Sequence, residues 1–125
     1  MGALAIGTAS AILCFFFATT VKQKLRYDDS LDVFGVHGIG GFLGTILAGV
    51  FVAKSLGGVG LNDGMTMGSQ VGVQFAAAGI TAVYSIVASI VILLVLKVVV
   101  GLRVDDETET RGLDLGEHGE RGYIL

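Results

Sequence analysis

The stretch VGVQFAAAGITAVYSIVASIVILLVL, residues 71–96, runs for 26 residues without an Asp, Glu, Lys or Arg. An α-helix rises about 1.5 Å per residue and the hydrocarbon core of a bilayer is about 30 Å thick, so the stretch can cross a membrane with some tilt. Two further stretches, residues 3–21 and 33–53, also lack Asp, Glu, Lys and Arg. The sequence therefore predicts an all-α membrane protein with three transmembrane helices.

The composition supports a membrane protein rather than a soluble one. Of the 125 residues, 53% are hydrophobic and only 15% are charged, which is more apolar surface than a short soluble chain can bury. The net charge of −3 comes from the end of the chain, where residues 103–125 hold seven acidic side chains against three arginines. We expect a transmembrane region over residues 1–102 and an acidic tail over residues 103–125. No basic face is present for a nucleic acid to bind.

The basic side chains that flank the spans predict the topology. They are Lys22, Lys24 and Arg26 after the first span, and Lys97 and Arg103 after the third. The connection between the second and third spans has only Lys54, offset by Asp63. By the positive-inside rule, the first two clusters face the cytoplasm. We therefore expect a multi-pass protein of the cell membrane, with its N-terminus outside and its C-terminus inside.

His37 is the unusual residue of the second span. An imidazole in hydrocarbon is costly unless its nitrogens find partners, so it is either a functional group or a hydrogen-bonding contact to an adjacent helix. In an α-helix it lies on the same side as Gly41, Gly44 and Ala48, which form a flat face that favours close helix packing. We expect the second span to be buried and His37 to point into a bundle. Three helices offer few neighbours, so we expect a larger bundle, formed by oligomerisation or by a longer protein.

Other residue patterns point to structural roles or to none. Asp29 and Asp32 precede the second span, where a carboxylate can cap a helix or hold the basic cluster. Cys14, the single cysteine, is expected to be a small apolar filler. The sequence shows no nucleophile beside a base, no phosphate-binding loop and no Cys/His cluster, so we expect no enzyme activity, no metal and no cofactor.

A family resemblance rests on a string of motifs spread over nearly the whole chain. DDSLDVFGVHGIGGFLGTILAGVF at residues 28–51, SLGGVG at 55–60, MTMG at 65–68 and GLRVDDETETRGLDLGEHGERGY at 101–123 resemble the ammonium transporters of the Amt/Mep/Rh superfamily, the Amt branch in particular. The resemblance implies a subunit of eleven spans, ten of which form two inverted repeats, and a trimer of such subunits. The chain resembles the last three spans and the cytoplasmic tail.

The resemblance also implies roles for particular residues. His37 matches the second of two pore histidines, Val33 and Phe34 are expected near the inner half of the pore, and Asp29 and Asp32 match carboxylates that stabilise the helix start. Ammonium is then deprotonated and conducted as ammonia past the histidine. The first pore histidine, the outer recruiting site and the phenylalanine gate lie in spans that this sequence does not contain.

The tail resembles a regulatory segment of the same family. Six residues match its motif: Gly112, Asp114, His118, Gly119, Glu120 and Tyr123. The family's segment packs across the homotrimer and helps to form a docking surface for a PII-type signalling protein. The expected function is ammonium transport and nitrogen uptake, with membrane lipid around the spans. The alternative is a non-conducting module that assembles with full-length subunits and regulates them.

Overall fold

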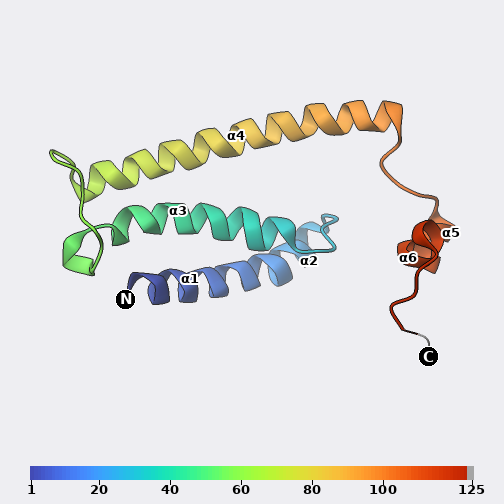
Figure 1. Ribbon diagram of the computed structural model, residues 1–125, viewed down its shortest axis with the longest axis horizontal. Coiled ribbons are helices and arrows are strands. Elements are labelled where there is room, and N and C mark those ends of the chain that lie inside the picture. Colours follow the sequence, from blue (N-terminus) through green and yellow to red (C-terminus); the bar gives the residue numbers. More distant parts are fainter. Residues whose placement is uncertain (124–125) are drawn as a thin grey trace. The chain divides into compact units, whose positions relative to one another are not determined.

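The structure is a computed structural model that describes residues 1–123, and every regular element in that range is a helix (Figure 1). The α-helices are α1 (Gly2–Phe16), α2 (Lys22–Leu25), α3 (Ile39–Phe51), α4 (Met67–Val99), α5 (Asp106–Arg111) and α6 (Leu113–His118). Two π-helices, η1 (Phe17–Val21) and η2 (Phe34–Gly38), and one 3-10 helix, η3 (Lys54–Leu56), complete the set. The all-helical fold class is thus confirmed.

Three continuous helical segments are long and apolar enough to cross a membrane, as the sequence predicts. They cover Gly2–Leu25, Phe34–Phe51 and Met67–Val99. The first runs past residue 21, where the predicted uncharged stretch ends, because Lys22 and Lys24 can stay helical while their ammonium groups reach polar surroundings. It ends at Arg26, which adopts the left-handed conformation with φ 52°.

The chain divides into two compact units, Met1–Val83 and Tyr84–Leu125, with the division inside α4. In the first unit, α1 and α3 run antiparallel and side by side (Figure 1). Glycines allow the close approach. A Cβ added to Gly40 would lie 2.9 Å from the Cys14 sulfur, and one added to Gly35 would lie 3.0 Å from the backbone nitrogen of Ala18. Larger residues at these positions would push the two spans apart.

The beginning of α4 packs against the other side of α3. Gly49 is buried there, and a Cβ added to it would lie 2.8 Å from Cγ of Gln74. The rings of Phe42 and Phe75 meet edge to face with centroids 6.0 Å apart. The second span therefore has one neighbour along Gly35 and Gly40 and another along Gly49.

Both π-helices depart from the regular α-helical spacing that the sequence predicts. A π-helix places one extra residue in a turn and closes hydrogen bonds between residues five apart. The Ile39 amide accordingly donates to the carbonyl of Phe34, and the Lys22 amide donates to that of Phe17. The two π-helices contact each other, and η2 contains His37.

A tight connection follows α3. The amide of Gly58 donates to the carbonyl of Ala53 over 3.0 Å, and that of Gly60 donates to the carbonyl of Val52 over 2.8 Å. The loop thus folds back onto the end of the helix. Ala53, which is 7% exposed, is the one buried hydrophobic residue in the described part of the chain.

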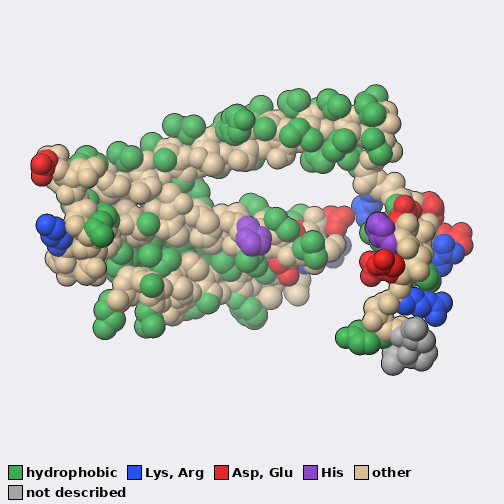
Figure 2. Space-filling model, viewed as in Figure 1, with side chains coloured by type: hydrophobic (Ala, Val, Ile, Leu, Met, Phe, Trp, Pro, Cys, Tyr) green, Lys and Arg blue, Asp and Glu red, His purple; other side chains and the backbone are tan. Residues whose placement is uncertain are grey.

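The second unit contains the end of α4 and the tail. Figure 2 shows hydrophobic side chains along α4, and acidic and basic side chains gathered over α5 and α6. The Arg103 guanidinium pairs with the Glu109 carboxylate at 2.8 Å. Gly112, with φ 99°, separates α5 from α6. The segment expected only as an acidic tail therefore contains two short helices.

Candidate functional site

His37 belongs to η2, which is a single π-helical turn, and its side chain is exposed. Within residues 1–123, the ring makes no hydrogen bond or ion pair. The alternative that this histidine joins two helices through a hydrogen bond is therefore not supported within this chain. The ring is free to meet a molecule or a helix from outside the chain.

The face that carries His37 is open. A Cβ added to Gly41 or Gly44 would meet nothing within 4 Å, and Ala48 is exposed. Between Phe34 and Phe51, this chain by itself buries only Gly35 and Gly49, so burial of the second span remains a prediction that needs helices from outside the chain. The physical reason is that α1 and α4 cover two sides of the helix and leave the third side uncovered.

Val33 and Phe34 begin the span, and each is about half exposed, at 50% and 51%. Phe34 belongs to an aromatic cluster. Its ring meets that of Phe17 at 6.4 Å and that of Tyr27 at 5.8 Å, both edge to face. Such edge contacts stabilise an arrangement beyond simple burial. They fix the start of the second span against the end of the first.

The two carboxylates before the second span make different contacts. Asp29 accepts hydrogen bonds from the amides of Val33, at 2.8 Å, and Phe34, at 2.9 Å, which is the geometry of a helix cap. Asp32, with φ 55°, instead pairs with Lys22 at 2.6 Å. One carboxylate therefore satisfies the first free amides of the helix, and the other ties the helix to the basic cluster.

Asp29→Ala is expected to destabilise the start of the second span. Two backbone amides lose their acceptor, and the loss of a helix cap costs about 1–2 kcal/mol. Hydrogen exchange of the Val33 and Phe34 amides in lipid bicelles measures the effect, and both should exchange faster. Ser30→Ala, an exposed change in the same turn, is the matched control. Equal exchange rates in the two variants would contradict the capping role.

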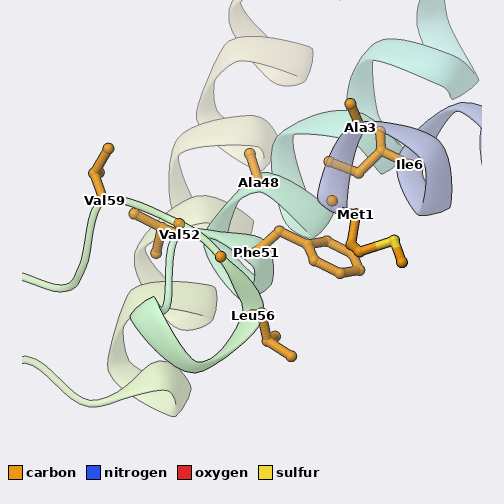
Figure 3. Close-up of a pocket in the computed structure, with 11 residues that line it drawn as sticks. Met1, Ala3, Ile6, Ala48, Phe51, Val52, Leu56 and Val59 are labelled. Atoms are coloured by element: carbon orange, nitrogen blue, oxygen red, sulfur yellow. The ribbon is translucent and has the colours of Figure 1, made fainter.

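An apolar pocket of about 510 Å³ includes Ala48 of the open face but neither His37 nor its neighbouring glycines. It is formed by the beginning of α1, the end of α3 and the connection after it. Figure 3 shows Met1, Ile6 and Phe51 around it, with the Met1 side chain beside the Phe51 ring. No residue from the predicted site lines it. The pocket and His37 are therefore separate features of the first unit.

The six tail residues with a predicted regulatory role lie in α6 or on either side of it. Asp114 and His118 belong to the helix, Gly112 and Gly119 flank it with φ 99° and 64°, and the others follow it. Gly112 and Gly119 thus end the short helix on both sides. The side chain of Tyr123 is 84% exposed, so its ring is accessible to another surface.

A capped helix precedes these tail residues. The Asp105 carboxylate accepts a hydrogen bond from the Thr108 amide at 2.8 Å and one from the Thr108 hydroxyl at 3.1 Å. The backbone hydrogen bond is the main reason, and the hydroxyl the second, that the pKa of Asp105 lies below its ordinary value of 3.8.

The tail helix α5 is expected to weaken in acid. A lowered carboxylate pKa means that the cap stabilises the helix above pH 3.8, and that this contribution is lost as the pH falls through the lowered value. NMR of the Thr108 amide during an acid titration measures the effect. Asp105→Asn should shift this amide at neutral pH and remove the titration step. An unchanged Thr108 amide in that variant would contradict the cap.

No group of three or more potential metal ligands occurs in the part of the chain that the structure describes. The site is therefore built of one exposed imidazole, a flat glycine face and an aromatic and ionic junction at one end of the spans. Such an arrangement can bind or pass a small polar molecule only if other helices cover the open side.

Comparisons with known proteins identify the relatives of the chain. The profile of the Ammonium Transporter Family matches residues 1–123. The chain is 43% identical over 127 residues to an ammonium transporter of Aquifex aeolicus (strain VF5), covering 100% of this chain and 29% of the relative. It is 42% identical over 130 residues to one of Mycobacterium tuberculosis (strain ATCC 25618 / H37Rv), covering 98% and 27%. It is 38% identical over 120 residues to one of Bacillus subtilis (strain 168), covering 94% and 30%.

The chain thus spans about three tenths of the length of the curated relatives it matches. These matches do not bear out the prediction that it corresponds to the carboxy-terminal part of a subunit. They also leave the greater part of each relative without a counterpart in these 125 residues.

Proposed function

Because the chain belongs to the ammonium transporter family, we propose that it forms one section of a transporter for ammonium or ammonia, with His37 beside the passage. The observation that carries the proposal is the free imidazole on the open glycine face of an apolar span. An ionisable residue within a membrane span is costly in lipid and is a candidate for a place on a substrate pathway.

The chemistry of the substrate explains why a histidine suits this place. An ammonium ion loses its hydration on entering an apolar passage, and that loss is costly, whereas neutral ammonia pays much less. A neutral imidazole has one donor and one acceptor nitrogen, so it can hydrogen-bond ammonia without adding a fixed charge. Val33 and Phe34, half exposed one turn earlier, would supply apolar surface to the same passage.

Three spans do not enclose a passage, so other helices must complete it. The open side of α3 offers the place for one of them, because Gly41 and Gly44 have room for a close neighbour. These helices come from the rest of a subunit or from another chain. We propose a homotrimer in a cell membrane as the complete assembly. The basic clusters at Lys22 and Lys97 support a cytoplasmic position for the tail.

A chimera tests this proposal. The section of the Aquifex aeolicus transporter that aligns with the chain is replaced by residues 1–125, and uptake of labelled methylammonium is measured in cells. We expect uptake by the chimera and none by the chain expressed by itself. A chimera that reaches the membrane and assembles but takes up no methylammonium would contradict the proposal.

A second candidate function rests on the exposed end of the chain, where the Tyr123 side chain is 84% exposed after α6. In this proposal the chain conducts nothing and regulates full-length subunits through its spans and tail. The exposed residues after α6 would then provide the contact with full-length subunits and with a PII-type protein. Coexpression tests it: the chain should change uptake by full-length subunits, and removing residues 103–125 should abolish that change. Unaltered uptake on coexpression would exclude it.

A further inference from the structure

We propose that Cys14 and Ala18 of the first span are positioning residues that fix the direction of the His37 side chain. The importance of that direction for transport rests on the proposed function, but the positioning itself does not. Cys14 and Ala18 lie four residues apart, and therefore on the same face of the helix that packs against η2. They contact the two residues that precede His37.

Cys14 contacts the peptide bond that leads into His37. Its thiol donates to the carbonyl oxygen of Val36, with the sulfur 3.6 Å from the oxygen. That carbonyl belongs to the peptide joining Val36 to His37. The hydrogen bond therefore restrains the orientation of the peptide plane next to the Cα of His37. A thiol is a weak donor, but in surroundings without water no solvent molecule competes for the same oxygen.

Ala18, on the same helix as Cys14, lies against Gly35, the residue before Val36. A Cβ added to Gly35 would lie 3.0 Å from the nitrogen, 3.1 Å from the Cα and 3.3 Å from the Cβ of Ala18. Two of these three atoms belong to the backbone, which cannot rotate away as a side chain can. Gly35 therefore approaches the backbone of the first span more closely than a residue with a side chain could without a shift.

Gly40 leaves the space that Cys14 needs. A Cβ at residue 40 would lie 2.9 Å from the Cys14 sulfur, closer than such atoms approach. The thiol therefore fits between the Val36 carbonyl on one side and the Cα of Gly40 on the other. A methyl group at residue 40 would displace the sulfur and break its hydrogen bond without changing Cys14 itself.

The π-helical turn makes this restraint necessary. A π-helix is less stable than an α-helix and persists where neighbouring groups hold it. Conversion of η2 to regular α-helix would remove the extra residue from the turn and change the backbone on both sides of His37, and with it the direction in which the imidazole leaves the helix. The contacts of Cys14 and Ala18 fall on residues 35 and 36, in the middle of this turn.

Two spectroscopic measurements on the full chain in lipid bicelles test the proposal. A ¹³C=¹⁸O label at Val36 reports the hydrogen bond through its amide I band, and ¹⁵N NMR of the His37 ring reports the surroundings of the imidazole. We expect Cys14→Ala to move the Val36 band to higher frequency and to shift the ring signals. Cys14→Ser, which keeps a donor, should keep the band near its wild-type position.

Glycine variants separate positioning from general damage. Gly40→Ala should reproduce both shifts, because its methyl group displaces the thiol. Gly41→Ala is the matched control, since a Cβ there meets nothing within 4 Å. Circular dichroism confirms that each variant keeps its helix content. An unmoved Val36 band or unmoved His37 signals in Cys14→Ala would overturn the proposal, as would equal shifts in Gly41→Ala.

The effect on transport is measured separately in the chimera. We expect Cys14→Ala to lower methylammonium uptake about fivefold, the factor that corresponds to one neutral hydrogen bond. Cys14→Ser should restore uptake. Failure of the proposed function would appear as an inactive wild-type chimera, whereas failure of the positioning role would appear as unchanged spectra in Cys14→Ala.

Discussion

Gly58→Ala is expected to unfold the connection between the second and third spans. A Cβ on Gly58 would overlap the carbonyl groups of Phe51 and Val52, which are backbone atoms at the end of α3. The amide of the same residue is held by the carbonyl of Ala53 at 3.0 Å, so the residue cannot move away without losing that bond. We expect a loss of stability on the order of 3 kcal/mol, at the upper end of overpacking effects.

The neighbouring glycine supplies a matched control. Gly57 has φ 87°, a conformation that side chains disfavour, but a Cβ there would meet nothing within 4 Å. Gly57→Ala should therefore cost only about 1 kcal/mol, from backbone strain alone. Unfolding of both variants in mixed detergent micelles, followed by circular dichroism, measures the difference. Equal stabilities would show that the loop does not fold back onto α3 as described.

The spans were predictable from the sequence because their cause is local. A run such as residues 71–96 has no charge to keep it in water, and its length alone matches a bilayer. The ends of the helices were less predictable. The helix of the third span, α4, begins at Met67 rather than at residue 71. Two reciprocal hydrogen bonds hold the turn at its start. The Thr66 hydroxyl accepts one from the Ser69 amide at 3.1 Å, and the Ser69 hydroxyl accepts one from the Thr66 amide at 2.9 Å. Hydropathy does not register such polar contacts.

The π-helices could not be predicted, because their cause lies in the packing between helices. Residues 17–21 and 34–38 contain nothing that forbids an α-helix, and the glycines of FGVHG suit either form. What distinguishes this region is the approach of Gly35 to Ala18, which only the folded chain shows. The surroundings of His37 could not be predicted for the same reason. A histidine within an apolar span is unusual, but the sequence could not show which side of the helix α1 would leave open.

His37→Ala in the chimera is expected to lower methylammonium uptake about tenfold or more. An imidazole hydrogen bond to a polar molecule in an apolar passage is worth roughly 1–1.5 kcal/mol or more, and a loss of that size in the barrier gives about a tenfold change in rate. Assembly should be unaffected, because within residues 1–123 the ring has no hydrogen-bonding partner to lose. Uptake in cells and the size of the purified complex measure the two effects.

The same variant separates a role in the passage from a role in packing. Thr45→Ala is the matched control: its hydroxyl already donates to the Gly41 carbonyl of its own helix at 2.9 Å, so its removal should leave uptake unchanged. If His37 served to bind a helix on the open side, His37→Ala would instead reduce the amount of assembled complex and spare the activity of what remains. Unchanged uptake together with unchanged discrimination against potassium would remove His37 from the passage, because a substrate that travels beside the imidazole must respond to its loss.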